Sequence, residues 1–203
     1  MEAQVGSAIA NMEINVLIQQ GEESVSLDND ESYSLSITKS GSNLVRVSVE
    51  ADCFQGARHA VETLFQLMDW DMDQGTFLVV DDVQITDRPF YAHRGLMIDT
   101  ARNFISVGKI KEALDSLSYS KMNVLHLHLT DSHSFPIQID FNPNFTNYGA
   151  YRADMIYSRD DLRELERYAT DRGVVIIPEL DTPGHIGAGW QAVDPTYAIC
   201  MDE

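Results

Sequence analysis

The sequence has few cysteines, few basic residues and no long apolar run. Of its 203 residues only Cys53 and Cys200 are cysteines, so the chain alone cannot form a disulfide framework or a cysteine metal cluster. Lys and Arg number 14 against 32 Asp and Glu, and the resulting net charge of −18 would repel nucleic acid and anionic membranes. No stretch approaches the ~20 apolar residues of a membrane span, and the first residues lack the pattern of a signal peptide. A hydrophobic fraction of 44% nevertheless suffices for a folded core, in which we expect Cys53 to be a small buried residue.

Alternating apolar residues in the first half predict strands around one helix. The alternation covers residues 12–18, 33–37 and 44–49, and turn residues 39–42 predict a hairpin between the last two strands. A helix is expected next, followed by strand over 77–85 with a kink at Asp81-Asp82. The helix face consists of Ala57, Ala60, Val61, Leu64 and Met68. These elements predict a small α+β domain over residues 12–87 that ends at Asp87-Arg88-Pro89.

Strands and helices alternate after position 90, which is typical of a parallel α/β fold. Strands are predicted over 95–98, 124–129 and 174–177, the last as an apolar run buried on both faces. Ser106 is expected to cap the first intervening helix. A capping box that begins at Ser158 is expected to start the second helix. The order is strand, helix, strand, helix, strand.

Polar residues follow each predicted strand of this second part. The first strand ends at Asp99–Arg102, the second at Thr130–His133, and the third at Pro178–Asp181, before Thr182–His185. Because ligands bind at the carboxyl ends of parallel strands, these segments predict a binding site. Caps and turns explain such clusters equally well, so both interpretations stay open.

The middle strand places His126 and His128 on one face and Leu125, Leu127 and Leu129 on the other. The leucines suit an interface with helices, which leaves the histidines on the inner face. Three interpretations remain: hydrogen-bonded core histidines, a metal-binding pair, or support for a ligand site. Glu179 on the third strand is interpreted as a buried, paired carboxylate.

Three segments resemble the signature stretches of glycoside hydrolase family 20, the β-N-acetylhexosaminidases, in the family's order. They are HRGLMIDTARNF at 93–104, LHLHLTDSHSFP at 125–136 and PELDTPGH at 178–185. The upstream α+β domain is similar to the small domain that precedes the barrel in this family, and the closest resemblance is to animal, arthropod-like members. The resemblance implies that residues 90–203 form the first part of a (β/α)₈ TIM barrel. Since such a barrel needs ~250 residues, the chain resembles an N-terminal fragment of the complete enzyme.

The activity that the resemblance implies is hydrolysis of terminal β-linked N-acetylhexosamine with retention, on chitin fragments or glycans. In this substrate-assisted reaction the sugar's acetamide oxygen attacks the anomeric carbon, while one carboxylate orients the acetamide and another protonates the leaving oxygen. The implied partner is an oligosaccharide or glycoconjugate, and no metal or cofactor is needed. By family the enzyme is secreted or lysosomal, and a homodimer of the complete enzyme is left open.

Position by position, the resemblance assigns substrate binding to Arg94 and supporting catalytic roles to Asp131, Asp181 and His185. His133 stands where the family usually has glutamine. The family's Gly-Gly-Asp-Glu segment has no match, because Asp202 and Glu203 lack flanking glycines. The acid/base glutamate is therefore expected beyond Glu203, and residues 1–203 alone are expected to be inactive.

Two other functions remain open at this stage. One is a non-catalytic sugar-binding or interaction fragment, and the other is a metal-dependent barrel hydrolase that uses His126 and His128.

Overall fold

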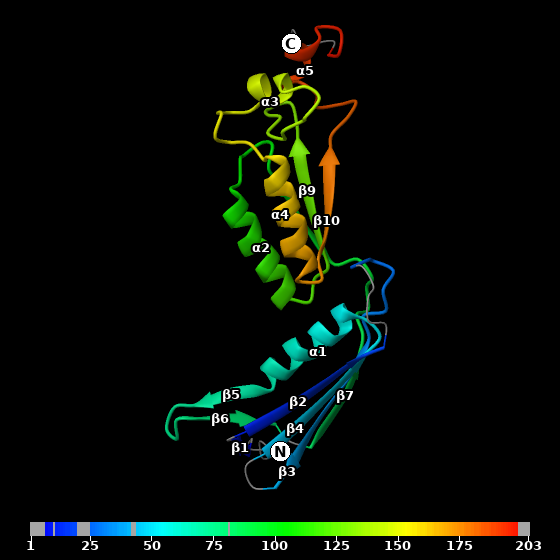
Figure 1. Ribbon diagram of the computed structural model, residues 1–203, viewed down its shortest axis with the longest axis vertical. Helices are drawn as coiled ribbons and strands as arrows, with labels where there is room; N and C mark the ends of the chain where they lie inside the picture. Colours follow the sequence, from blue (N-terminus) through cyan, green and yellow to red (C-terminus); the bar gives the residue numbers. More distant parts are fainter. Residues whose placement is uncertain (1–6, 10, 20–24, 42–43, 81, 199–203) are drawn as a thin grey trace. The chain divides into compact units, whose positions relative to one another are not determined.

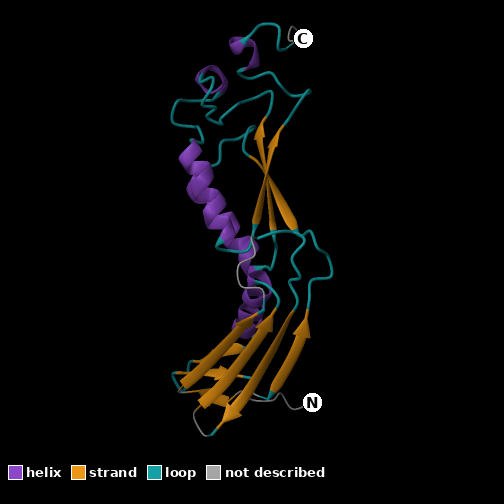
Figure 2. Cartoon of the chain, turned by 45° about the vertical axis from the view of Figure 1, so that its right-hand side comes forward, coloured by secondary structure: helices purple, strands orange, loops and turns teal. Residues whose placement is uncertain are grey.

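The structure is a computed structural model that describes residues 7–9, 11–19, 25–41, 44–80 and 82–198. Cys200, Asp202 and Glu203 lie outside these residues. The chain forms two compact units, residues 1–92 and 93–203 (Figures 1 and 2). The elements of the first unit are β1 (Ser7–Ile9), β2 (Asn11–Ile18), β3 (Tyr33–Ser40), β4 (Leu44–Ala51), α1 (Phe54–Gln66), β5 (Met68–Asp71), β6 (Thr76–Val79) and β7 (Val83–Asp87). Those of the second are β8 (Gly95–Asp99), α2 (Val107–Tyr119), β9 (Val124–Thr130), α3 (Asn144–Gly149), α4 (Arg159–Thr170), β10 (Val175–Leu180) and α5 (Trp190–Val193).

The first unit is built on a four-stranded sheet in the order β2-β4-β3-β7. Strands β3 and β4 pair antiparallel, with Ile37 opposite Val47, which confirms the predicted hairpin. The buried side chains of these strands, together with Ala57, Ala60 and Leu64 of α1, form one core. Cys53, just before α1, is also buried. The alternating apolar residues of the strands and the apolar face of α1 thus pack against each other in one layer.

Two expectations for the first unit are wrong. The strand expected over 77–85, with a kink at Asp81-Asp82, is divided into two strands, β6 in a sheet with β1 and β5, and β7 in the larger sheet. Asp82, between them, has a φ of 54°, in the left-handed region where a strand cannot continue. Met68, expected on the helix, begins β5, because α1 ends at Gln66.

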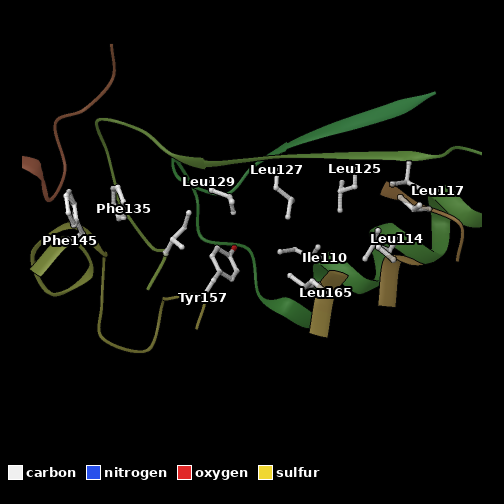
Figure 3. Packing of buried hydrophobic residues seen from close by; sticks show 13 residues of the cluster. Ile110, Leu114, Leu117, Leu125, Leu127, Leu129, Phe135, Phe145, Tyr157 and Leu165 are labelled. Carbon is white, nitrogen blue, oxygen red and sulfur yellow. The ribbon is translucent and has the colours of Figure 1, made fainter. Parts of the chain in front are cut away.

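The second unit contains a parallel sheet in the order β10-β9-β8, with α2 and α4 packed against it. Leu125, Leu127 and Leu129 of β9 are at most 2% exposed and face these helices (Figure 3). They contact a core whose other large members are Ile110, Leu114, Leu117, Phe135, Ile137, Phe145, Tyr157 and Leu165. The predicted separation of leucines and histidines onto opposite faces of β9 is therefore confirmed.

Other details of this unit differ from the sequence-based prediction. Residues 175–177 of β10 are only partly buried, although Val174 is fully buried. Strand β10 lies at one edge of the described sheet, and this explains their exposure. Ser106 occupies the N-cap position of α2, but among the described residues its side chain makes no capping hydrogen bond. Within that same part of the chain, no helix is long and apolar enough to cross a membrane.

The capping box of α4 is present as predicted. The Ser158 Oγ accepts a hydrogen bond from the Asp161 backbone N at 3.1 Å, and the Ser158 N donates to the Asp161 carboxylate at 2.9 Å. Each bond satisfies a backbone N–H that has no partner within the helix.

Replacing Ser158 with Ala should loosen the first turn of α4. Loss of an N-cap costs about 0.5–2 kcal/mol, so amide exchange in that turn should become about 2- to 30-fold faster. Hydrogen exchange of the full-length protein measures this, with Ser48→Ala, at an exposed position of β4, as the control. Equal exchange of α4 in both variants would show that the cap contributes nothing.

Candidate active site

The register of the parallel sheet brings three polar side chains into one row. Asp99 of β8 lies opposite His128 of β9, and His128 lies opposite Glu179 of β10. Paired residues on neighbouring parallel strands point to the same face, so this row lies on the face opposite the leucine core. The loops that follow these strands carry Arg102, the Asp131 segment and the segment from Asp181 to His185.

Asp131 is the central acceptor of the site. Its carboxylate is 1% exposed and lies within 3.5 Å of several donors. Oδ2 is 2.8 Å from Arg102 Nη2, 3.0 Å from His128 Nε2 and 3.5 Å from His185 Nδ1. Oδ1 accepts from the backbone N of Ser132 at 2.7 Å and is 3.3 Å from His133 Nδ1.

These donors keep Asp131 ionised. Burial raises the pKa of the Asp131 carboxyl group, but hydrogen bonds from His128, His133 and the Ser132 backbone, together with the charge of Arg102, outweigh burial. The net effect holds its pKa below the ordinary value of 3.8. The site therefore contains a buried negative charge that is matched by cationic and polar donors.

Arg102 is clamped between two carboxylates. Its Nη1 lies 2.7 Å from Asp99 Oδ2, and its Nη2 lies 2.8 Å from Asp131 Oδ2, while the side chain stays 45% exposed. Burial raises the pKa of Asp99, but the Arg102 backbone and guanidinium outweigh burial and lower it. A guanidinium has five N–H donors, and these two contacts do not use all of them. Because the side chain is partly exposed, the remaining N–H groups can donate to ligand hydroxyls.

Hydroxyl groups of the segment after β9 hold the loop that carries Arg102. Ser134 Oγ donates to the Ala101 carbonyl at 2.5 Å, and Tyr151 Oη donates to the Arg102 carbonyl at 2.9 Å. Tyr157 Oη donates to the Ile105 carbonyl at 2.5 Å, and its burial raises the pKa of the phenol to about 12. The position of Arg102 thus depends on a segment more than 30 residues away in the sequence.

Asp181 and His185 form the exposed side of the site. His185 Nδ1 lies 2.7 Å from Asp181 Oδ2, and the imidazole is 57% exposed. The backbone of His185 has a φ of 55°, which is uncommon for a residue other than glycine. Backbone strain of this kind clusters at functional sites, because the surrounding structure must maintain it.

The structure brings together Asp131, Asp181 and His185, but it does not bring Arg94 to them. Arg94 precedes β8, and its Nε donates to the Lys121 carbonyl at 2.8 Å. The Asn123 backbone N donates to the Arg94 carbonyl, and Asp131 follows the other end of β9, eight residues further along. At ~3.3 Å per strand residue this is a separation of about 26 Å. The arginine of the cluster is Arg102. Its signal was present in the sequence, because it closes the Asp99–Arg102 segment at the end of the first predicted strand.

His126 and His128 both contact Glu179, on the strand beside them. His126 Nε2 lies 2.5 Å from Glu179 Oε2, and His128 Nδ1 lies 3.2 Å from Glu179 Oε1. Ligand-type atoms of His128, Glu179 and Asp181 lie within 4.8 Å of one another, as do those of Asp131, Asp181 and His185. The contacts between these groups, and between Asp131 and Arg102, are those of a hydrogen-bonded network, and we assign no metal ligand among them.

Carboxylates, imidazoles and an exposed guanidinium at the carboxyl ends of parallel strands are typical of an enzyme active site in an α/β fold. Residues 91–202, more than half of the chain, match the family described as "Glycosyl hydrolase family 20, catalytic domain". Residues 2–67 match the family described as "beta-acetyl hexosaminidase like". The chain belongs to glycoside hydrolase family 20.

Individual relatives agree with this assignment. A chitooligosaccharidolytic β-N-acetylglucosaminidase of Bombyx mori is 43% identical over 87% of this chain and 29% of its own length. A β-hexosaminidase of Emericella nidulans is 47% identical over 85% of this chain and 28% of its own length. The structure of a chitobiase from Flavobacterium johnsoniae matches with a TM-score of 0.73 and 34% identity, over 86% of this chain and 25% of that one. The chain thus spans less than a third of each relative. Because an insect and a fungal protein match at similar identity, the arthropod-like branch stays a prediction.

The charges in this site predict how stability depends on pH. The pKa of Asp131 is lowered, so this carboxylate stabilises the folded state above pH 3.8. That contribution to the free energy of unfolding is lost as the pH falls through the folded-state pKa. The pKa of His128 is raised, because bonds to Asp131 and Glu179 outweigh the burial that lowers it. Its contribution is present below 6.5 and is lost as the pH rises through its folded-state pKa.

Both contributions are complete between pH 3.8 and 6.5, so thermal stability should be highest there. The unfolding midpoint of the full-length protein, measured from about pH 3 to 9, should depend less on pH in Asp131→Asn. Asp160→Asn, at a side chain that is 93% exposed, is the control. Parallel pH curves for wild type and Asp131→Asn would contradict this assignment.

Proposed function

We propose that the full-length protein containing this chain hydrolyses terminal β-linked N-acetylhexosamine with retention of configuration. The observation that carries this proposal is the Arg102–Asp131–Asp181–His185 cluster at the strand ends of a family 20 chain. Names of the relatives support it, since they include a chitooligosaccharidolytic β-N-acetylglucosaminidase and β-hexosaminidases. The substrate would be an oligosaccharide or glycoconjugate that ends in N-acetylhexosamine.

The proposal includes an architecture. Residues 12–87 would be the small α+β domain, and residues 90–203 would be the first part of a (β/α)₈ barrel. The order β8-α2-β9-α4-β10, with parallel pairing of neighbouring strands, supports a barrel because each strand pairs with the next strand in the sequence. By family resemblance the full-length enzyme would be secreted or lysosomal. Its assembly as a homodimer stays open.

In the proposed mechanism the acetamide oxygen of the substrate attacks the anomeric carbon and displaces the leaving sugar. A proton must reach the leaving oxygen from a carboxylic acid. We place that acid, with the carboxylate that orients the acetamide, in a segment after Glu203, since the relatives are more than three times as long as the matched region. Asp131, Asp181 and His185 would set the electrostatic surroundings of that acid. His185 is exposed and paired with Asp181, so it is available to a neighbouring carboxyl group.

The direct test is release of the aglycone from an aryl β-N-acetylglucosaminide by the full-length protein. We expect turnover that is unchanged by a chelator, because no step of the proposed reaction uses a metal. The corresponding α-glycoside is the matched control substrate and should not be hydrolysed. Activity that disappears with chelator and returns with zinc would contradict the proposal and favour the metal-dependent alternative that uses His126 and His128.

The substrate-binding arginine can be identified by comparing two variants of the full-length enzyme. We propose Arg102, because its guanidinium is in the cluster, whereas the family resemblance assigned this role to Arg94. A hydrogen bond to a charged group contributes about 1.5–3 kcal/mol, so Arg102→Ala should lower kcat/KM by about 10- to 150-fold. Arg94→Ala should stay within about threefold of wild type. The opposite order of effects would return the role to Arg94.

A further inference from the structure

We propose that His128 is an imidazolium held between Glu179 and Asp131, and that Glu179 is a positioning residue for the Asp131 cluster. This inference deepens the proposed function and rests on it for its kinetic consequences. The charge state of His128 can be tested without any activity. Glu179 would act through His128 and would not itself touch the substrate.

The first argument is the number of acceptors around the imidazole. His128 Nδ1 lies 3.2 Å from Glu179 Oε1, and Nε2 lies 3.0 Å from Asp131 Oδ2. A neutral imidazole has one N–H donor and one lone pair, so one of its nitrogens would face a carboxylate with a lone pair. Only the imidazolium donates from both nitrogens. With the His128 side chain 7% exposed, water cannot readily relieve a mismatch.

The second argument is where else the proton could be. Protonated Asp131 would lose its ion pair with Arg102 at 2.8 Å. Protonated Glu179 would lose the negative charge that attracts His126 Nε2 at 2.5 Å and His128 Nδ1 at 3.2 Å. Placing the proton on His128 satisfies every contact of this row at once.

The third argument is the charge that surrounds His128. Glu179 from β10, Asp99 from β8 and Asp131 from the loop after β9 face it, and Arg102 is the cation beside Asp99 and Asp131. One guanidinium cannot balance these carboxylates. A second positive charge on His128 reduces the imbalance, in accord with the raised pKa of this imidazole.

The connection to the site runs through one oxygen. Asp131 Oδ2, which His128 contacts, also contacts Arg102 and lies 3.5 Å from His185. Loss of the His128 proton would remove the attraction that holds Glu179, His128 and Asp131 in line. Asp131 could then rotate away from the arginine and the histidine that it aligns. His126, 2.5 Å from Glu179, fixes the far end of this row.

The experiment compares Glu179→Gln with Glu166→Gln, the same substitution on the exposed surface of α4, in the full-length protein. The neutral amide of the Glu179→Gln variant cannot stabilise the imidazolium by charge, so His128 should lose its proton at lower pH. We expect kcat at neutral pH to fall about tenfold, with KM within about threefold, and the alkaline limb of the kcat profile to move to lower pH. Activity should recover toward the wild-type value in mild acid, where Asp131 alone keeps His128 charged. Glu166→Gln should match wild type throughout. A purely structural defect would instead lower kcat equally at every pH, and that result would overturn the positioning role.

The second measurement is ¹⁵N NMR of histidine-labelled wild-type protein at neutral pH, with the His128 signals identified by their loss in His128→Gln. We expect both ring nitrogens of His128 to be protonated. A neutral tautomer would overturn the proposal whether or not Glu179→Gln folds. If wild type hydrolyses no β-N-acetylhexosaminide while His128 is doubly protonated, the proposed function fails and the charge state stands.

Discussion

The second unit depends above all on the buried carboxylate of Asp131. A negative charge with 1% side-chain exposure is costly unless donors surround it, and Arg102, His128, His133 and the Ser132 backbone supply them. These donors come from β9 itself and from the loops after β8 and β9. Satisfying one carboxylate therefore fixes the relative position of neighbouring strand ends. The ion pairs of the site therefore stabilise the fold, since removing one partner would leave an uncompensated buried charge.

The alternation of β9 separates this polar network from the apolar core. Leu125, Leu127 and Leu129 bury one face of the strand against α2 and α4, while His126 and His128 occupy the other. Parallel register then places Asp99 and Glu179 beside His128 without any further constraint. A shift of the register by one residue would send the leucines to the polar face and the histidines into the core. Packing of the helices against the leucines thus places Asp99, His128 and Glu179 side by side on the other face. Any other register would separate these charged groups and is therefore less stable.

Periodicity predicted the elements of this fold better than it predicted their limits or their functional residues. The β3–β4 hairpin, the α4 capping box and the two faces of β9 could be predicted because each depends on residues close in sequence. A kink at Asp81-Asp82 was predicted, but the division of 77–85 between two sheets was not, because β6 pairs with β1 and β7 with β3, both distant in the sequence. Candidate loops at the strand ends were evident, and Asp131, Asp181 and His185 do lie together. The position of Arg102 after the first predicted strand, and of Arg94 before it, could also be read from the sequence. The hydroxyl–carbonyl bonds that anchor the Arg102 loop could not, because they join segments that are 33 to 52 residues apart.

These anchoring bonds have a consequence for binding. A flexible arginine loses about 2 kcal/mol of rotamer entropy when a ligand immobilises it. In this structure Asp99 and Asp131 already hold both Nη atoms of Arg102, and Tyr151 holds its backbone carbonyl. Most of that entropy is therefore lost on folding and not on binding. The proposed substrate is a neutral sugar, which has no charge to attract it to an acidic chain, so donors that are already in place would contribute to its affinity. A rigid, half-exposed guanidinium meets this requirement, because it orients hydroxyls without having to desolvate a free cation.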